Sequence, residues 1–240
     1  AQGGMVDTPD GDWYAFMFQD RGALGRAPVL MPMHFEDGFP IIGENGKVPE
    51  VVTVLDTGYQ YAAINGSDDF FYKPDENGQI TLKNFWEFNH QQMDDFWSVT
   101  ENPGHLRLHS AKLSPTLFQA YNTLTQRTVG PKCAAEVTLR FAHMKNGDVA
   151  GISTFIGNYG FTGVKKENDQ FYLIMMGRPA KDTTVFGQFE YENPGIEYQR
   201  VPIIDTSVCL RAEADFTDKK DLASFFYKNR EGWQKLGIDQ

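Results

Sequence analysis

Residues 2–26 read QGGMVDTPDGDWYAFMFQDRGALGR, and residues 35–40 read FEDGFP. Within the first stretch, the apolar and aromatic run at 13–18 lies between turn residues at 9–12 and 20–22. A short apolar run bounded by turn residues is typical of a buried strand. In the turn before the run, proline presets φ, aspartate bonds the backbone and glycine accepts a positive φ. The residues alone therefore predict a small antiparallel sheet at the start of the chain.

Length and composition restrict the classes of protein to which the chain can belong. Its 240 residues, 41% of them hydrophobic, are enough for one large all-β domain or for a small domain with a second piece. The net charge of −10 disfavours nucleic acid as a partner, because phosphate binding needs clustered Lys and Arg. No stretch approaches the ~20 apolar residues of a membrane span, so no membrane partner is expected. No signal peptide is visible, and the cellular location stays open.

Residues 51–83 separate the N-terminal sheet from the rest of the chain. They begin with a short strand pattern and continue as a polar, acidic and turn-rich stretch, which is the composition of a connector. From residue 84 onward, short strand patterns alternate with turns, and residues 136–141 and 208–213 alternate polar with apolar side chains. That period of two is typical of a sheet with one face in water. We therefore predict an all-β chain whose larger part is an antiparallel β-sandwich.

Several ordered motifs resemble glycoside hydrolase family 43, the group of β-xylosidases and α-arabinofuranosidases. The stretch from residue 2 to residue 49 is similar to the last blade of that family's five-bladed β-propeller. Three later motifs resemble the concanavalin A-like sandwich that follows the propeller: WEFNH at 86–90, NTLTQRTVGP at 122–131 and FFYKNREGWQKLG at 225–237. Together these resemblances cover nearly the whole chain.

The resemblance implies three parts and a longer parent protein. Residues 1–50 would be the incomplete last blade, 51–83 the connector and 84–240 the accessory sandwich. Because a blade buries its faces against neighbouring blades around a central channel, we expect the chain to be the C-terminal part of a larger enzyme. The family's sandwich continues past the point at which this chain stops, so its closing strands are expected to be absent. Missing strands would leave sheet edges unpaired.

The implied activity of the parent is that of an exo-β-1,4-xylosidase, with α-L-arabinofuranosidase activity as a second option. An inverting glycosidase uses a general acid and a general base whose carboxyls lie ~6.5–9.5 Å apart. In family 43 these carboxylates come from earlier blades, so no catalytic residue is expected here, and the chain alone should be inactive. The implied partner is a xylo-oligosaccharide or arabinoxylan. No cofactor is required, and a structural calcium would belong to the intact parent.

Two polar residues of the blade are candidates for substrate binding. Arg26, in the pair Gly25-Arg26, matches the family's Gly-Arg motif, whose guanidinium contacts sugar hydroxyls and the catalytic carboxylates. A rigid fork of donors that stays charged at any working pH suits this task. Gln2 lies where many members carry an axis-facing histidine, sometimes near a calcium ion. Its different side chain puts the axial metal in doubt, and a role within the strand is the other interpretation.

Aromatic residues of the sandwich are candidates for a sugar platform, because sugars stack their apolar faces on rings. Core packing is the favoured interpretation for each such ring taken singly, since large aromatics usually fill the space between two sheets. Tyr159 and Phe161 flank glycines in a turn-like stretch, so these two are the rings most expected to be exposed. If the sandwich works alone, the chain would be a non-catalytic, lectin-like binding module, although such a module has no use for a detached blade. The other candidates are Trp86, Trp97, Tyr172 and Trp233.

The chain has two cysteines, Cys133 and Cys209, each in a strand-like context. Two cysteines at this spacing carry no metal signature and no redox motif. We expect two buried thiols, since free cysteine packs as a small apolar residue. A disulfide is the alternative, and the sequence cannot place the two sulfurs within reach of each other.

Overall fold

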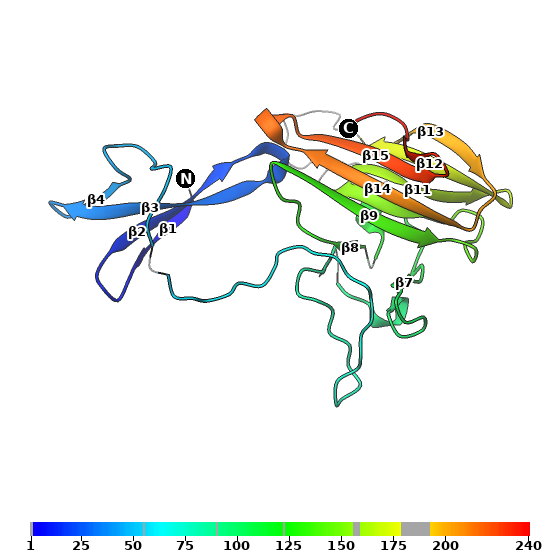
Figure 1. Ribbon diagram of the computed structural model, residues 1–240, viewed down its shortest axis with the longest axis horizontal. Helices are drawn as coiled ribbons and strands as arrows, with labels where there is room; N and C mark the ends of the chain where they lie inside the picture. The colour runs from blue at the N-terminus through cyan, green and yellow to red at the C-terminus, as the bar shows by residue number, and fades with distance from the viewer. Residues whose placement is uncertain (1, 55, 90, 122, 156–158, 179–192) are drawn as a thin grey trace. The chain divides into compact units, whose positions relative to one another are not determined.

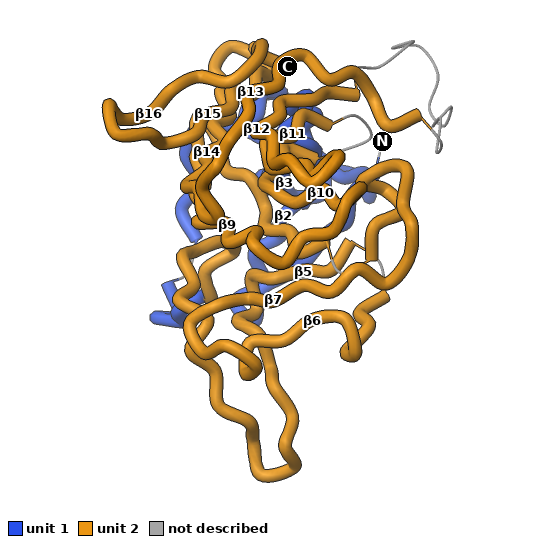
Figure 2. Tube along the Cα trace, turned by 90° about the vertical axis from the view of Figure 1, so that its right-hand side faces the viewer, with its two compact units in different colours: residues 1–61 blue, residues 62–240 orange. Residues whose placement is uncertain are grey.

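The computed structural model describes the chain from residue 2 to residue 240, apart from residues 55, 90, 122, 156–158 and 179–192. The chain divides into two compact units, residues 1–61 and residues 62–240, which are coloured separately in Figure 2. Regular structure in the described residues consists of β-strands and single 3-10 turns. The prediction of an all-β chain is therefore confirmed. The boundary between the units falls inside the predicted connector.

Unit 1 is a four-stranded antiparallel sheet in which each strand pairs with the next along the chain. Such a meander is the form of a propeller blade. A 3-10 turn, η1 (Gly22–Leu24), joins the second strand to the third. At the following hairpin, Asp37 and Gly38 both have a positive φ, which suits aspartate and glycine. The strands are β1 (Gly3–Asp7), β2 (Trp13–Asp20), β3 (Arg26–Glu36) and β4 (Phe39–Ile42).

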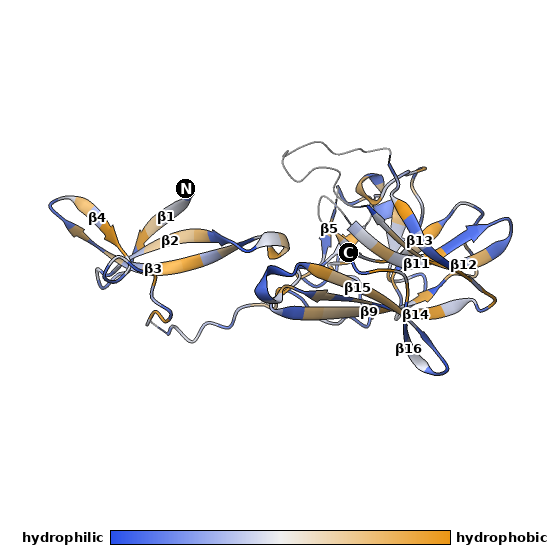
Figure 3. Cartoon of the chain, turned by 90° about the horizontal axis from the view of Figure 1, so that it is seen from above, coloured by the Kyte–Doolittle hydropathy of each residue, from blue (hydrophilic) through white to orange (hydrophobic). Residues whose placement is uncertain are grey.

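The blade is apolar on both faces. Ala15, Met31 and Met33 are buried on one face, where alternate residues of β2 and β3 lie opposite one another. The other face carries Phe16 and Phe18, which remain 49% and 36% exposed. Figure 3 shows hydrophobic residues along much of β3. A sheet with two apolar faces needs a further layer on each side, as in a propeller.

Unit 2 contains two four-stranded antiparallel sheets, with strand orders β10-β11-β12-β13 and β16-β15-β14-β9 (Figure 1). They form the predicted sandwich. The first sheet is made of β10 (Val149–Phe155), β11 (Tyr159–Glu167), β12 (Gln170–Arg178) and β13 (Ile196–Ile203). The second is made of β9 (Lys132–Arg140), β14 (Ser207–Asp215), β15 (Leu222–Asn229) and β16 (Gly232–Lys235).

Side chains from both sheets form the main core of the sandwich. Phe225 has no exposed surface, and its ring reaches the backbone of the opposite sheet at Gly160. A Cβ added to Gly160 would lie 2.5 Å from the Cζ atom of that ring, so glycine is required there. The core is formed by Phe141, Val164, Leu173, Met175, Val208, Leu210, Ala212, Ala223, Phe225 and Leu236.

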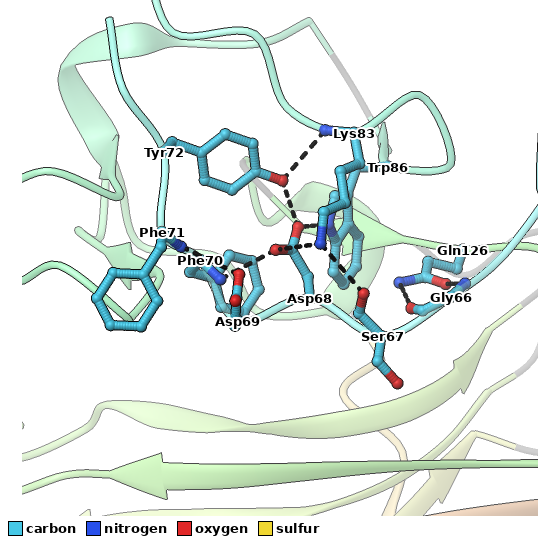
Figure 4. A network of polar contacts seen from close by, with 10 residues as sticks. All are labelled: Gly66, Ser67, Asp68, Asp69, Phe70, Phe71, Tyr72, Lys83, Trp86 and Gln126. Atoms are coloured by element: carbon cyan, nitrogen blue, oxygen red, sulfur yellow. Dashed lines mark hydrogen bonds and ion pairs between the residues drawn. The ribbon is translucent and has the colours of Figure 1, made fainter.

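The segment from residue 62 to residue 131 adds short structures to unit 2. A buried carboxylate, Asp68, fixes its first part (Figure 4). Two reciprocal hydrogen bonds of 2.9 and 3.0 Å tie Gly66 to the side chain of Gln126. The short elements are β5 (Glu87–Phe88) paired with β8 (Leu124–Thr125), β6 (Trp97–Ser98) paired with β7 (Arg107–Leu108), and the turns η2 (Asp94–Phe96), η3 (Leu117–Gln119) and, later in the chain, η4 (Thr217–Lys219).

Candidate substrate-binding site

A tight connection between β2 and β3 positions Arg26. The carboxylate of Asp20 accepts a hydrogen bond of 2.9 Å from the backbone N–H of Gly22. The N–H of Arg21 donates to the carbonyl of Gly25 at 2.8 Å, and Gly25 has a φ of 89° that suits glycine. These bonds close the turn, so Arg26 enters β3 directly opposite Asp20. The local sequence thus fixes the position in the sheet from which the Arg26 side chain extends.

Arg26 contacts two side chains of the blade. Its Nη1 donates a hydrogen bond of 3.3 Å to Oε1 of Gln2. Its guanidinium carbon lies 4.8 Å from the centre of the Phe18 ring, within the range of a cation–π contact. The structure therefore brings together the two blade residues that the sequence singled out. Gln2 uses one of the five donors of the guanidinium, and the side chain of Arg26 is exposed.

Phe18 is a member of this cluster that sequence reasoning missed. In the β2–β3 register, Phe18 lies opposite Pro28, so it is the diagonal neighbour of Arg26 on the same face of the sheet. Diagonal neighbours on one face of an antiparallel pair are within reach of long and aromatic side chains. The pairing around the Asp20–Gly25 turn was the signal that could have revealed it. The apolar run by itself indicated only a buried strand.

The structure contradicts the choice of Tyr159 and Phe161 as the exposed rings, and it agrees with core packing, the favoured interpretation for each ring. They are 5% and 7% exposed, and they belong to a second apolar cluster with Ile174. Leu117 and Phe118 pack against this cluster. The hydroxyl of Tyr159 donates to the carbonyl of Pro194 at 3.0 Å, and burial raises the pKa of Tyr159. These rings are therefore core residues and offer no sugar platform.

Two glycines explain why Phe161 in particular is buried. A Cβ on Gly163 would lie 2.5 Å from the ring atom Cζ of Phe161, and one on Gly151 would lie 2.9 Å from it. The ring therefore fills the space that the two glycines leave on their sheet. The stretch around Gly160 had been interpreted from the sequence as turn-like. Gly160 lies instead within β11, as part of the sheet that carries both rings.

Three of the four remaining aromatic candidates have structural partners. The indole N–H of Trp86 donates to Asp68 at 2.8 Å, and that of Trp97 donates to Asp94 at 3.2 Å. The ring of Tyr172 lies 4.7 Å below the guanidinium carbon of Arg200. Trp233, in β16, is partly exposed. It is the candidate whose surroundings resemble a binding surface.

The network around Asp68 is the most buried polar cluster that sequence reasoning missed. The carboxylate has no exposed surface, and it accepts hydrogen bonds from the Tyr72 hydroxyl, the Phe70 backbone and Trp86, beside the ammonium of Lys83 (Figure 4). Burial by itself raises the pKa of Asp68, but these donors outweigh burial and leave the pKa below its usual value. Burial and the neighbouring carboxylate raise the pKa of Tyr72 to about 12. An ionised, fully bonded carboxylate supports structure and is a poor proton donor.

Other carboxylates with a displaced pKa are displaced in the same direction. Hydrogen bonds from Arg200 and Lys165 lower the pKa of Glu167. Hydrogen bonds from Thr217 lower the pKa of Asp215, and hydrogen bonds from Lys235 and Ser224 lower that of Asp239. A general acid of a glycosidase needs a raised pKa. These groups are therefore suited to binding and structure.

Further expectations about metals, cysteines and membranes can be compared with the structure. Among the described residues, no group of three His, Cys, Asp or Glu side chains is placed to hold a metal ion. Cys133 and Cys209 are free thiols, as expected, although each residue is only partly buried, and the disulfide alternative is wrong. In the described part of the chain, no helix is long and apolar enough to cross a membrane.

Comparison with known proteins places this geometry in a family. Residues 75–240 match the family model of the "Beta xylosidase C-terminal Concanavalin A-like domain". A beta-xylosidase from Formosa agariphila is 30% identical over 213 residues, which cover 74% of this chain and 35% of the relative. The chain spans about a third of the length of the curated relatives that it matches.

Two solved structures are similar over the whole chain. A bifunctional GH43-CE protein from Bacteroides eggerthii has a TM-score of 0.84 and 36% identity, over 100% of this chain and 29% of that one. A GH43 glycoside hydrolase engineered to display both endo-xylanase and exo-arabinofuranosidase activity has a TM-score of 0.80 and 28% identity, over 100% of this chain and 47% of that one. The chain therefore belongs to glycoside hydrolase family 43, and its larger unit is the β-xylosidase C-terminal concanavalin A-like domain.

Proposed function

We propose that this chain forms part of a family 43 glycosidase that removes sugars from the non-reducing ends of xylan-derived oligosaccharides with inversion. Exo-β-1,4-xylosidase activity is the first candidate, in line with the names of two relatives, and α-L-arabinofuranosidase activity is the second, in line with a Bacteroides ovatus relative of that name. The observation that carries the proposal is the exposed guanidinium of Arg26, held between Gln2 and Phe18. Its donors suit sugar hydroxyls and carboxylates.

The two units would have different tasks in that enzyme. The blade would complete a propeller, since its two apolar faces need neighbours, and it would present Arg26 to the pocket. The acid and the base would come from blades outside this stretch. The sandwich would shape the rim of the active site, bind xylo-oligosaccharide, or do both. The electrostatics support this division, because the displaced carboxyl pKa values are lowered.

Two measurements test the proposal. The 240-residue chain by itself should not hydrolyse an aryl xyloside, whereas a polypeptide in which the preceding blades are joined to it should. In that polypeptide, Arg26→Ala should lower kcat/KM by about 10²-fold or more, because a charged contact to the transition state is lost. Arg21→Ala, an exposed arginine of the same turn, is the matched control and should leave kcat/KM unchanged.

The outcomes separate the parts of the proposal. Turnover by the chain alone would contradict the assignment of the acid and base to other blades. An unchanged kcat/KM for Arg26→Ala would remove this residue from the site. Proton NMR of the first product formed should show the anomer opposite to that of the substrate, and retention would exclude inversion.

A further inference from the structure

We propose that the outer face of the sheet β16-β15-β14-β9 binds a short neutral oligosaccharide of the xylan type, with Trp233 as the stacking ring and Arg211 and its carboxylate partners as the hydrogen-bonding groups. The class of sugar rests on the proposed function. The surface itself rests on the side chains that this sheet turns away from the core. Its residues belong to the sandwich unit, whereas the cluster around Arg26 belongs to the blade.

Strand alternation determines which residues occupy this outer face. In β14, the buried residues Leu210 and Ala212 alternate with Arg211 and Glu213, which point the other way. Their neighbours across the sheet follow from the register, in which Arg211 pairs with Glu136 on one side and with Phe226 on the other. Around Arg211 this face therefore carries polar side chains of β9 and β14, and β15, which lies between β14 and β16, contributes Phe226. No single sequence motif contains this face, because Glu136 and Trp233 lie 97 residues apart along the chain.

The charges on this face compensate one another. Nη1 of Arg211 lies 3.0 Å from a carboxylate oxygen of Glu136, and its Nε lies 2.7 Å from one of Glu213. Lys132 pairs in the same way with Asp215 at 3.0 Å. A surface of paired donors and acceptors with little net charge suits hydroxyl groups, which both donate and accept. A phosphate or an acidic chain would instead require an excess of cations.

The cations beside Trp233 lie farther from its ring than the cation beside Tyr172 does. Arg211 and Lys228 each lie 5.7 Å from its centre, close to the outer limit of a cation–π contact. On the other sheet, Arg200 lies 4.7 Å from the ring of Tyr172. Ion pairs with Glu197 and Glu167 hold that guanidinium in place. Arg211 is likewise held by Glu136 and Glu213, but it lies farther from the centre of the Trp233 ring than Arg200 does from that of Tyr172.

A shallow depression lies on the same outer face as the ring. It has a volume of about 450 Å³, which lies within the range of small-molecule sites, and it is open to solvent. Its lining comes from β9, β14 and β15 and includes Arg211, Glu213 and Ser224. Because Arg211 lines the depression and lies beside Trp233, one sugar residue could stack on the indole while the next enters the depression. The site would therefore accept a chain of at least two sugars.

Calorimetric titration of the full 240-residue chain with xylohexaose tests this surface. We expect saturable binding with a Kd in the high micromolar to millimolar range, as a shallow platform gives. Trp233→Ala should raise the Kd by about 10-fold or more, because the stacking ring is a central anchor. Trp233→Phe should restore part of the affinity. Tyr172→Ala is the matched control, since it removes a ring of similar size on the other sheet, and it should leave the Kd unchanged.

Glu213→Gln provides a variant that keeps the shape of the side chain if Trp233→Ala fails to fold. It removes the charge that orients Arg211 and should also weaken binding. No saturable heat with xylohexaose would overturn the proposal, as would a loss of binding in Tyr172→Ala but not in Trp233→Ala. Tighter binding of an acidic galacturonic acid oligomer than of xylohexaose would contradict the proposal that the ligand is neutral. These results are independent of the Arg26 test, because the titration uses a chain expected to lack turnover.

Discussion

The blade and the sandwich are both built from four-stranded antiparallel sheets, but they differ in how their apolar residues are covered. The blade buries three residues in its core cluster and leaves Phe16 49% and Phe39 72% exposed. The sandwich supplies two facing sheets, whose main core cluster contains ten buried residues. The strands alone therefore do not determine stability. What matters is whether the chain also provides the layer that covers them.

The two regions also differ in how far their polar groups are buried. In the sandwich unit, Asp68 is buried and its donors surround it, so the group holds a segment in place. In the blade, Arg26 is exposed and shares only part of its donors with Gln2. A saturated buried ion serves structure, whereas an exposed fork of donors is available to a ligand. This contrast supports a structural role for the first cluster and a binding role for the second.

The largest expected effect is the loss of unfolding free energy on truncating a core residue of the sandwich, compared with the same change in the blade. Phe225→Ala should lower the free energy of unfolding by about 3–5 kcal/mol, because it leaves a cavity between two sheets. Met31→Ala in the blade should change it by only about 1 kcal/mol or less, since a sheet without a covering layer adds little stability. Urea unfolding followed by far-UV circular dichroism measures both. Equal losses would show that the blade has a core as strong as that of the sandwich.

A smaller effect is expected from the buried carboxylate. Asp68→Asn should lower the free energy of unfolding by about 3 kcal/mol at pH 7, because Lys83 loses its partner and the hydrogen bonds lose their charge. Asp69→Asn is the matched control, since its neighbouring carboxylate is exposed, and it should have little effect. Trp86 fluorescence, added to the circular dichroism signal, reports on the segment that Asp68 holds.

The pH dependence of this pair of variants gives an independent check. In the folded state the pKa of Asp68 lies below its ordinary value of 3.8. A lowered carboxyl pKa contributes stability above the unfolded pKa, and the contribution is lost as the pH falls through the folded value. The difference between the original chain and Asp68→Asn should therefore be constant near neutral pH and shrink below pH 3.8. A difference that grows on acidification would contradict the assignment.

The smallest expected effect concerns the cysteines. In the register of β9 and β14, Cys133 lies opposite Ala214 and Cys209 lies opposite Thr138, so the two are five positions apart along the pair. That separation is about 16 Å along a strand, beyond the reach of a disulfide. A reducing agent should therefore leave the melting temperature unchanged, and both thiols should react with an alkylating reagent after unfolding. A lower melting temperature under reduction would mean that the sandwich relies on a crosslink as well as on its core.

Much of the fold could be predicted from local patterns. The run at residues 13–18 became β2, and the alternating stretch at 208–213 lies within β14. The polar stretch at 51–83 contains the boundary between the units, but its second half joins the sandwich unit. Composition could not show this, because Asp68 and its donors are polar residues whose burial depends on partners as distant as Trp86. A turn-rich stretch and a buried polar network have the same composition.

The candidate binding residues divide in the same way. Arg26 and Gln2 could be selected from the sequence through a motif, and the structure brings them into contact. Tyr159 and Phe161 were the rings most expected to be exposed, because glycines flank them, although core packing was favoured for each ring taken singly. They are buried because Leu117 and Phe118, some 40 residues away, pack over their cluster. Exposure depends on what lies above a residue, and no local pattern contains that information.

By itself, the sequence determined the all-β class, the strands and turns, the two-part organisation and the family, because these depend on periodicity, turn chemistry and ordered motifs within short stretches. Only the tertiary structure decided which aromatic rings are covered, which carboxylate is buried and which residues share the face around Trp233. Those properties are set by register and by the packing of one sheet against distant segments. A side chain acquires its exposure, its pKa and its partners from neighbours that lie far away along the chain.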